Sequence, residues 1–242
     1  MPKPQILVLK DANAVAHAGA ERVRQAGHLA VSLRGSFHWV LAGGNTPRAL
    51  YELLVSEEAV NWRATHVYFG DERHVLPTDP DSNYGMAERA LFRHGLLAPD
   101  RILRMRGELP SREGAMDYEE RLRAAFPDAA WPTFDLVLLG LGADGHTASL
   151  FPHTAALDSG PRWVMHNQVP SLGTERLTLT FPALNAAREI VFLVAGADKA
   201  RALHALVEGH QPVAEIPARG VQPASGQCLI LADEAAAAGL RR

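Results

Sequence analysis

The chain has 242 residues, 47% of them hydrophobic and 21% charged, which is enough for one α/β domain with a sizeable core. The formal net charge of -3 argues against general binding to nucleic acid or to an anionic membrane surface. The first apolar run, residues 6–9, is too short for a signal peptide, and no run approaches a membrane span. We therefore expect a single cytoplasmic domain over residues 1–242, as a monomer or a small homo-oligomer, without nucleic-acid or membrane partners.

Short apolar runs alternate with segments of helical spacing along the whole chain. The predicted strands are residues 6–9, 39–42, 67–69, 136–139, 163–167, 177–181, 190–194 and 228–231. The predicted helices are residues 11–33, 47–55, 83–94, 111–125, 197–208 and 233–240. Several strands are apolar throughout, as strands covered on both faces of a parallel sheet are. This alternation predicts an α/β three-layer sandwich with a mostly parallel, Rossmann-like sheet, whose ligands bind beyond the carboxyl ends of the strands.

The first strand-ending loop with possible chemistry is Gly43-Gly44-Asn45-Thr46-Pro47. We expect Thr46 to be a helix N-cap and Pro47 to take the first helical position. The two glycines allow a sharp turn that presents amide groups at a helix amino terminus, which is an anion site. The loop lacks the Gly-Lys-Thr of a P-loop, so an ordinary strand-to-helix turn is the alternative.

The second loop is Asp71-Glu72-Arg73, directly after the run 67–69. Side chains alternate in extended backbone, so we expect Asp71 and Arg73 to share one side. A carboxylate beside a guanidinium can orient a catalytic partner and bind a phosphate. A solvated surface ion pair is the alternative interpretation.

The third loop joins an acid and a histidine, Asp144 and His146, in a glycine-rich turn after the apolar run 136–139. Histidine is the usual general base near neutral pH, and a nearby carboxylate can fix its tautomer. Gly140, Gly142 and Gly145 also spell the dinucleotide pattern Gly-x-Gly-x-x-Gly. Pro152 follows too soon for the long helix that this pattern should open, so the pattern is a weak nucleotide signal.

Two cations further along the chain complete the candidate site. Arg176 opens the predicted strand 177–181, and Lys199 falls in the first turn of the predicted helix 197–208. The helix dipole disfavours a cation at that end unless an anion is bound, so Lys199 is predicted to bind phosphate.

Several other chemistries have no motif here. There is no Gly-x-Ser-x-Gly, which argues against a serine esterase. Asp144, His146 and His153 are candidates for a metal site, but no His-Glu-x-x-His or Cys/His cluster has ligand spacing, so we expect no metal and no cofactor. The single cysteine, Cys228, excludes an intrachain disulfide, and its apolar run predicts a buried strand rather than a reactive thiol.

With these loops in this order, the sequence resembles the 6-phosphogluconolactonase family over nearly the whole chain. The stretches that carry the resemblance are residues 41–47, 70–73, 81–84, 142–152, 175–178 and 196–199. The related glucosamine-6-phosphate deaminases typically have tyrosine where this chain has Arg73. They also have Phe-Asn-Glu-Pro where this chain has Ser-Leu-Phe-Pro at residues 149–152, and the missing glutamate is their helper for ring opening. The chain departs from the lactonases in having Asn45 where serine is more common, and Leu76 where proline is more common.

The resemblance implies hydrolysis of 6-phospho-D-glucono-1,5-lactone to 6-phospho-D-gluconate, a step of the oxidative pentose phosphate pathway. It implies that His146 deprotonates water for attack on C1, and that Asp71 or Asp144 orients the imidazole. Arg73 then stabilises the oxyanion or clamps the substrate, and Arg176, Lys199 and the loop Gly43, Gly44, Asn45 and Thr46 hold the phosphate. The alternatives are a deaminase-like isomerase, a dinucleotide-dependent oxidoreductase and a non-catalytic sugar-phosphate-binding protein.

Overall fold

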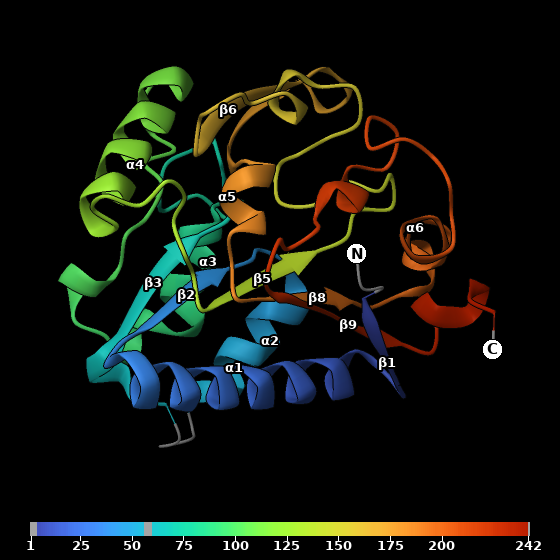
Figure 1. Ribbon diagram of the computed structural model, residues 1–242, viewed down its shortest axis with the longest axis horizontal. Helices are drawn as coiled ribbons and strands as arrows, with labels where there is room; N and C mark the ends of the chain where they lie inside the picture. The colour runs from blue at the N-terminus through green and yellow to red at the C-terminus, as the bar shows by residue number, and fades with distance from the viewer. Residues whose placement is uncertain (1–3, 56–59, 242) are drawn as a thin grey trace.

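A six-stranded parallel sheet forms the centre of the structure, a computed structural model that describes residues 4–55 and 60–241 (Figure 1). Every pair of neighbouring strands is parallel, in the order β1-β9-β8-β5-β2-β3. The strands are β1 (Gln5–Leu9), β2 (Phe37–Leu41), β3 (Thr65–Phe69), β5 (Leu136–Gly140), β8 (Glu189–Val194) and β9 (Gln227–Asp233). The predicted parallel α/β architecture is confirmed.

Helices cover both faces of this sheet. Figure 1 shows α1 (Ala12–Arg34) and α2 (Asn45–Val55) along one face, and α4 (Ser111–Ala125) and α5 (Phe181–Asn185) on the other side. The helix α1 begins where the Asp11 side chain accepts the Ala14 N–H at 2.9 Å, and it ends at the left-handed Gly35. Of the two shorter helices, α3 (Asn83–Ala90) lies in the chain after β4, and α6 (Ala200–Val207) lies after β8. None of the described helices is both long and apolar enough to cross a membrane.

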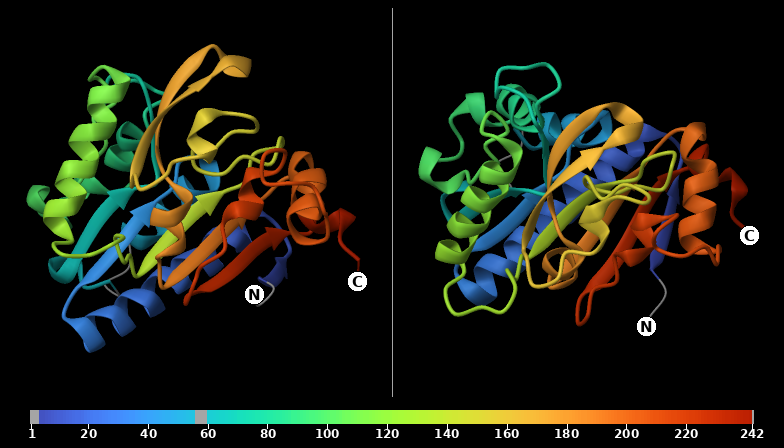
Figure 2. Two further views of the ribbon diagram at one scale, coloured as in Figure 1. Left: turned by 45° about the horizontal axis from the view of Figure 1, so that its top comes forward. Right: turned by 90° about the horizontal axis from the view of Figure 1, so that it is seen from above.

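A second, antiparallel sheet of three strands was not separated from the first by the sequence pattern. Its order is β4-β7-β6, with β4 at Asp71–Arg73, β6 at Val164–Val169 and β7 at Thr174–Leu179. Figure 2 shows the β6–β7 hairpin rising above the parallel sheet. The predicted strands 163–167 and 177–181 are therefore strands, but they belong to this sheet, and Phe181 begins α5 instead. The two strands pair as a hairpin because a tight turn at Pro170–Leu172 and Gly173 joins them. The alternation of apolar residues within each strand does not predict which sheet the strand joins.

Three predicted helices are shorter than the sequence suggested. In the predicted helix 83–94, α3 ends at Ala90 and a separate 3₁₀ turn covers Phe92–His94. In 197–208, a 3₁₀ turn at Ala197–Lys199 precedes α6. In 233–240, Asp233 remains in β9 and only Ala236–Gly239 form a 3₁₀ turn. The Asp233 carboxylate accepts the N–H groups of Gly196 and Ala236, which fixes both neighbouring turns to the end of β9.

The order of the parallel strands places the loops after β2 and β5 at a switch point. From β2 the chain proceeds outward to β3, then returns to β5 on the other side of β2 and continues to β8 and β9. The two loops therefore diverge and leave a crevice between them, which is where open α/β sheets bind ligands. Two buried tyrosines fix the neighbouring strand ends: the Tyr51 hydroxyl bonds both backbone groups of Ala42, and the Tyr118 hydroxyl bonds both of Phe69.

At the opposite end of β2 and β3, two histidines stack against each other. His38 and His66 are paired in register, and their nearly parallel rings lie 5.0 Å apart. The His38 ring also bonds the hydroxyls of Ser36 and Tyr68, and His66 Nε2 faces Arg101 Nη1 at 2.9 Å. Burial lowers the pKa of both histidines, and the positive charge of Arg101 further lowers the pKa of His66.

These lowered pKa values predict a loss of stability on mild acidification. In the unfolded chain each histidine titrates near pH 6.5. Below that pH the unfolded chain binds protons that folded His38 and His66 do not, so stability falls as the pH drops toward the folded pKa values. The fall in Tm between pH 7.5 and 5.5 should therefore be smaller in His66→Gln than in the wild type. His94→Gln, which changes an exposed histidine, should keep the wild-type fall. Equal falls in all three proteins would contradict this account.

Candidate active site

A cavity of about 570 Å³ lies beyond the carboxyl ends of the parallel strands, at the switch point between β2 and β5. Apart from Asp144, every residue that the sequence assigned to the site lines this cavity. These residues are Gly43, Gly44, Asn45, Thr46, Asp71, Arg73, His146, Arg176 and Lys199. Residues from both sheets and from five separate loops or strands thus meet in one place, because the second sheet stands over the end of the first.

His146 is held by the aspartate two residues before it. Its Nδ1 lies 2.6 Å from Asp144 Oδ1, which also accepts the His146 backbone N–H at 3.1 Å. The Phe151 ring stacks on the imidazole with the ring centres 4.0 Å apart. Burial raises the pKa of Asp144, but the hydrogen bonds and charge of His146 outweigh it and hold that pKa below its usual value. Because Asp144 accepts at Nδ1, the neutral ring carries its proton there and keeps the Nε2 lone pair for another partner.

The glycines of this turn position His146 and do not form a dinucleotide site. Residues 141–154, after β5, form turns and an isolated bridge, so the helix that the Gly-x-Gly-x-x-Gly pattern requires is not there. Gly145 has a φ of 84°, and its N–H bonds the Gly142 carbonyl at 3.0 Å. Gly142 also donates to the His146 carbonyl at 2.8 Å. The pattern therefore folds the chain back so that Asp144 meets His146.

Gly142 is the residue of this turn at which a small substitution should cost the most. A Cβ built at Gly142 would overlap both the His146 ring and the Asp144 carboxylate. Gly142→Ala should separate the two side chains and lower kcat/KM at least about tenfold, as expected for a disturbed general base. Gly239→Ala provides the control, because a Cβ there makes only ordinary contacts, at 3.6 Å and beyond, and Gly239 does not line the cavity. Activity close to that of Gly239→Ala would show that the close packing at Gly142 does not matter.

The sequence left open whether Asp71 or Asp144 orients His146. The Asp71 carboxylate is bonded elsewhere: Oδ2 accepts the Ser149 hydroxyl at 2.7 Å, and Oδ1 lies 3.3 Å from Asn83 Nδ2. No bond between Asp71 and His146 exists among the described residues. The geometry therefore agrees with Asp144 as the residue that orients His146. Asp71 lines the cavity instead, and its two partners, Ser149 and Asn83, were not predicted from the sequence to be functional.

Arg73 and Arg176 bring two positive charges to one wall of the cavity. They are directly paired in the β4–β7 register, so their strands hold them next to each other. Burial, and then the positive charge of Arg73, lower the pKa of Arg176. Arg73 donates to the backbone carbonyl of Asp81. Two neighbouring guanidinium groups repel each other, and an anion that binds between them removes this repulsion.

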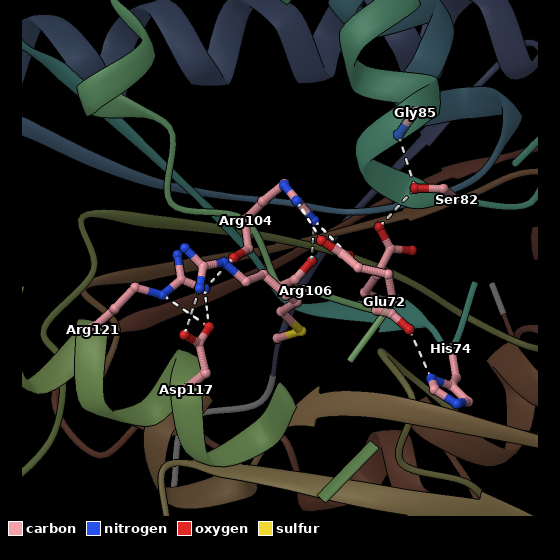
Figure 3. Close-up of polar contacts among 11 residues, drawn as sticks. Glu72, His74, Ser82, Gly85, Arg104, Arg106, Asp117 and Arg121 are labelled. Atoms are coloured by element: carbon pink, nitrogen blue, oxygen red, sulfur yellow. Dashed lines mark hydrogen bonds and ion pairs between the residues drawn. The ribbon is translucent and has the colours of Figure 1, made fainter. Parts of the chain in front are cut away.

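Glu72 does not line the cavity but fixes the strand that does. Glu72 as a whole is only 2% exposed, and its carboxylate accepts hydrogen bonds from the N–H groups of Arg73, Asn83 and Tyr84 and from the Ser82 hydroxyl. Figure 3 shows this carboxylate reaching Ser82 at the start of α3. Burial raises the pKa of Glu72, and the four donors oppose that rise. The alternation of side chains correctly predicts that Glu72 points away from its two neighbours, but not that it anchors a helix.

In the loop of residues 43–47, the helix begins two residues earlier than predicted. The helix α2 begins at Asn45, and Gly44 takes the N-cap position with a φ of 106°, its carbonyl accepting the Arg48 N–H. The prediction that Thr46 is the N-cap is therefore wrong, because the glycine pair completes the turn before Thr46 is reached. Thr46 instead lies in the first helical turn, where its backbone amide is among those a helix start leaves without a helical partner.

Lys199 faces the same cavity from the other side of the switch point. It ends the 3₁₀ turn Ala197–Lys199 just before α6, and its Nζ lies 2.9 Å from the Asp198 carboxylate. The lysine therefore stands at the start of α6 with an exposed acid as its partner. A bound anion can replace that partner, because the ion pair is open to solvent.

Positive charge also extends beyond the cavity. A second cavity of about 420 Å³ adjoins the first and shares Arg73 with it. Its lining adds the three arginines Arg48, Arg89 and Arg93, which outnumber the two acids Glu52 and Asp81. The chain as a whole has a formal net charge of -3. Positive charge collected at this place in an acidic protein favours an anionic ligand.

The described residues offer no obvious metal site. In residues 4–55 and 60–241, no three His, Cys, Asp or Glu side chains are grouped to hold a metal ion. His153, which the sequence considered beside Asp144 and His146, has a φ of 58° and bonds the Ala214 carbonyl through its backbone N–H. Cys228 lies in β9 as predicted; it is half-buried, and burial raises the pKa of its thiol to about 11.

Known proteins resemble this chain over most of its length. Residues 10–230 match the model of the family described as glucosamine-6-phosphate isomerases/6-phosphogluconolactonase. A 6-phosphogluconolactonase of Synechocystis sp. is 42% identical over 88% of each chain. One of Nostoc sp. is 36% identical over 98% of this chain and 99% of its own. The structure of 6-phosphogluconolactonase from Trypanosoma cruzi superposes with a TM-score of 0.87 and 26% identity, covering 99% of this chain and 98% of that one.

Proposed function

The chain belongs to the family of glucosamine-6-phosphate isomerases and 6-phosphogluconolactonases, and we infer that it hydrolyses 6-phospho-D-glucono-1,5-lactone to 6-phospho-D-gluconate. The observation that carries this function is the Asp144–His146 pair at a cavity whose other walls bear Arg73, Arg176 and Lys199. A lactone is an activated ester, so a positioned base and stabilisation of the oxyanion are sufficient for its hydrolysis.

We assign the first proton transfer to His146. With Nδ1–H donated to Asp144, Nε2 accepts a proton from water as the water oxygen attacks C1 of the lactone. The carbonyl π pair moves onto oxygen, and the tetrahedral oxyanion then reforms the carbonyl as the bond from C1 to the ring oxygen breaks. The imidazolium returns its proton to that leaving oxygen, which becomes the 5-hydroxyl of the open acid. Asp144 stabilises the positive imidazolium between the two transfers.

We assign the remaining cavity residues to binding. Arg176, Lys199 and the backbone amides at the start of α2 hold the phosphate, since a helix amino terminus and two cations line the same cavity. Arg73 adds charge beside Arg176. The half-buried position of Arg176 next to a like charge supports this assignment, because its electrostatic cost is removed when the dianion binds.

The direct test is to assay the purified protein, with and without a chelator, on the phosphorylated lactone, its open acid, glucosamine 6-phosphate and NADP⁺. It should hydrolyse the phosphorylated lactone, release no ammonia from glucosamine 6-phosphate, and show no binding of NADP⁺ by calorimetry. Ammonia release would favour the isomerase branch of the family. Binding of the phosphorylated acid without turnover of its lactone would favour a non-catalytic binding protein. Loss of lactonase activity on chelation, restored by zinc, would overturn the metal-free mechanism.

A further inference from the structure

Ser149 lies on the loop that carries His146, yet the mechanism above gives it no role. We propose that Ser149 is a positioning residue that holds the Asp71 carboxylate in one orientation, so that Asp71 accepts a hydrogen bond from a hydroxyl of the bound sugar. The inference rests on the proposed function, because it concerns the same cavity and the same class of ligand. Both residues line the cavity, and the Ser149 hydroxyl donates to Asp71 Oδ2 at 2.7 Å.

The position of Ser149 is fixed by neighbours from both strands of the hairpin. Its side chain and backbone are 1% exposed in total. Its N–H donates to Thr178 Oγ1 at 3.2 Å, and its carbonyl accepts from Asn167 Nδ2 at 2.9 Å. Thr178 is itself the register partner of Asp71 in the β4–β7 pair. Because the backbone of Ser149 is bonded on both sides, its hydroxyl has a defined place from which to hold the carboxylate.

The other oxygen of Asp71 is held from the opposite side. Asn83 Nδ2 lies 2.9 Å from the Asp71 backbone carbonyl and 3.3 Å from Oδ1. Asn83 is 2% exposed, and its own N–H is fixed by Glu72 Oε1 at 2.7 Å. The opposite side of the Asn83 amide packs against Gly43, where a Cβ would overlap it. Each carboxylate oxygen of Asp71 thus receives one donor from a fixed side chain.

This arrangement leaves Asp71 able to accept from a ligand. An ionised carboxylate has about four acceptor sites, and Ser149 and Asn83 occupy one on each oxygen. The remaining sites suit the hydroxyl groups of a sugar acid or lactone, which are neutral donors. A carboxylate free to rotate would have to be ordered at each binding event, whereas one held on both oxygens is already placed. Ser149 therefore acts on the ligand through Asp71.

The test is a double-mutant cycle with Ser149→Ala, Asp71→Ala and the double variant. Hydrolysis of the phosphorylated lactone is measured as kcat and KM, and binding of 6-phosphogluconate as Kd. Ser149→Ala should lower kcat/KM and weaken binding about 2- to 12-fold, the range for the cost of ordering one further side chain on binding. In the Asp71→Ala background the same change should have an effect of less than about twofold, because its target is gone. Equal effects of Ser149→Ala in both backgrounds would show that Ser149 does not act through Asp71.

Matched variants separate this role from stability. Thr65→Val removes an equally buried hydroxyl at the far end of β3, where Thr65 Oγ1 donates to the Asn61 carbonyl, and should lower Tm without changing Kd or kcat/KM. If Ser149→Ala does not fold, Ser149→Cys serves in its place, because the thiol keeps a weak hydrogen-bond donor. Its Kd for 6-phosphogluconate and its kcat/KM should lie between those of the wild type and those of Asp71→Ala. A wild type that binds 6-phosphogluconate without hydrolysing the lactone would refute the proposed function alone. A wild type that does neither refutes both.

Discussion

Replacing His146 with alanine should lower kcat/KM for the phosphorylated lactone about 10²–10⁴-fold while the protein remains folded. The imidazole lines the cavity, and its Nδ1 is fixed by a neighbouring carboxylate, 2.6 Å from Asp144 Oδ1. Its side chain is 30% exposed, so its removal leaves no buried cavity large enough to threaten the fold. Initial rates must be corrected for spontaneous lactone opening, and circular dichroism with Tm confirms the fold.

Two variants at nearby positions test the role of the Asp144–His146 pair and provide a control. Asp144→Asn keeps the shape of the orienting group but removes its charge, so it should lose activity but less than His146→Ala. His153→Asn changes a histidine in the segment after the loop that does not line the cavity, and asparagine tolerates its φ of 58°. The kcat/KM of His153→Asn should therefore stay near the wild-type value. A folded His146→Ala protein with near wild-type turnover would remove His146 from the mechanism.

The second large effect is expected at the cations Arg176 and Lys199. Changing either to alanine should lower kcat/KM for the phosphorylated lactone about 10- to 150-fold, which corresponds to ~1.5–3 kcal/mol for a charge-assisted contact. Unphosphorylated gluconolactone never makes these contacts, so its slower hydrolysis should hardly change. Arg176→Ala should also keep a Tm close to wild type, because the lost guanidinium lies beside the like charge of Arg73.

The comparison of the two lactones is what identifies the role. If both substrates lose activity equally in Arg176→Ala or Lys199→Ala, the residue serves the chemistry or the fold, and the phosphate assignment is wrong. Arg48→Ala is the control, since Arg48 carries a charge near the start of α2 but lines only the adjoining cavity. The same comparison for Arg73→Ala decides between its two proposed roles, because only a phosphate ligand would affect one substrate alone.

The residues of the cavity could be named from the sequence because of a rule of parallel sheets. The strands of the parallel sheet all end in loops at the same edge, so Gly44, Asp71 and His146 come together although they are far apart in the chain. The pairing of Asp144 with His146 is also local, since two residues and a glycine turn separate them. Strand and helix periods, glycine turns and strand-end positions are short-range properties, and the sequence alone determined them.

The tertiary structure decided the contacts that no local pattern encodes. The bond from Ser149 to Asp71 joins residues 78 positions apart, and it exists because β4 pairs with β7 in a second sheet that stands over the first. The same packing brings Arg73 opposite Arg176 and directs Asp71 toward Ser149 and not toward His146. Such bonds depend on the relative placement of two sheets, which follows from burial of the whole core rather than from the spacing of residues in any one segment.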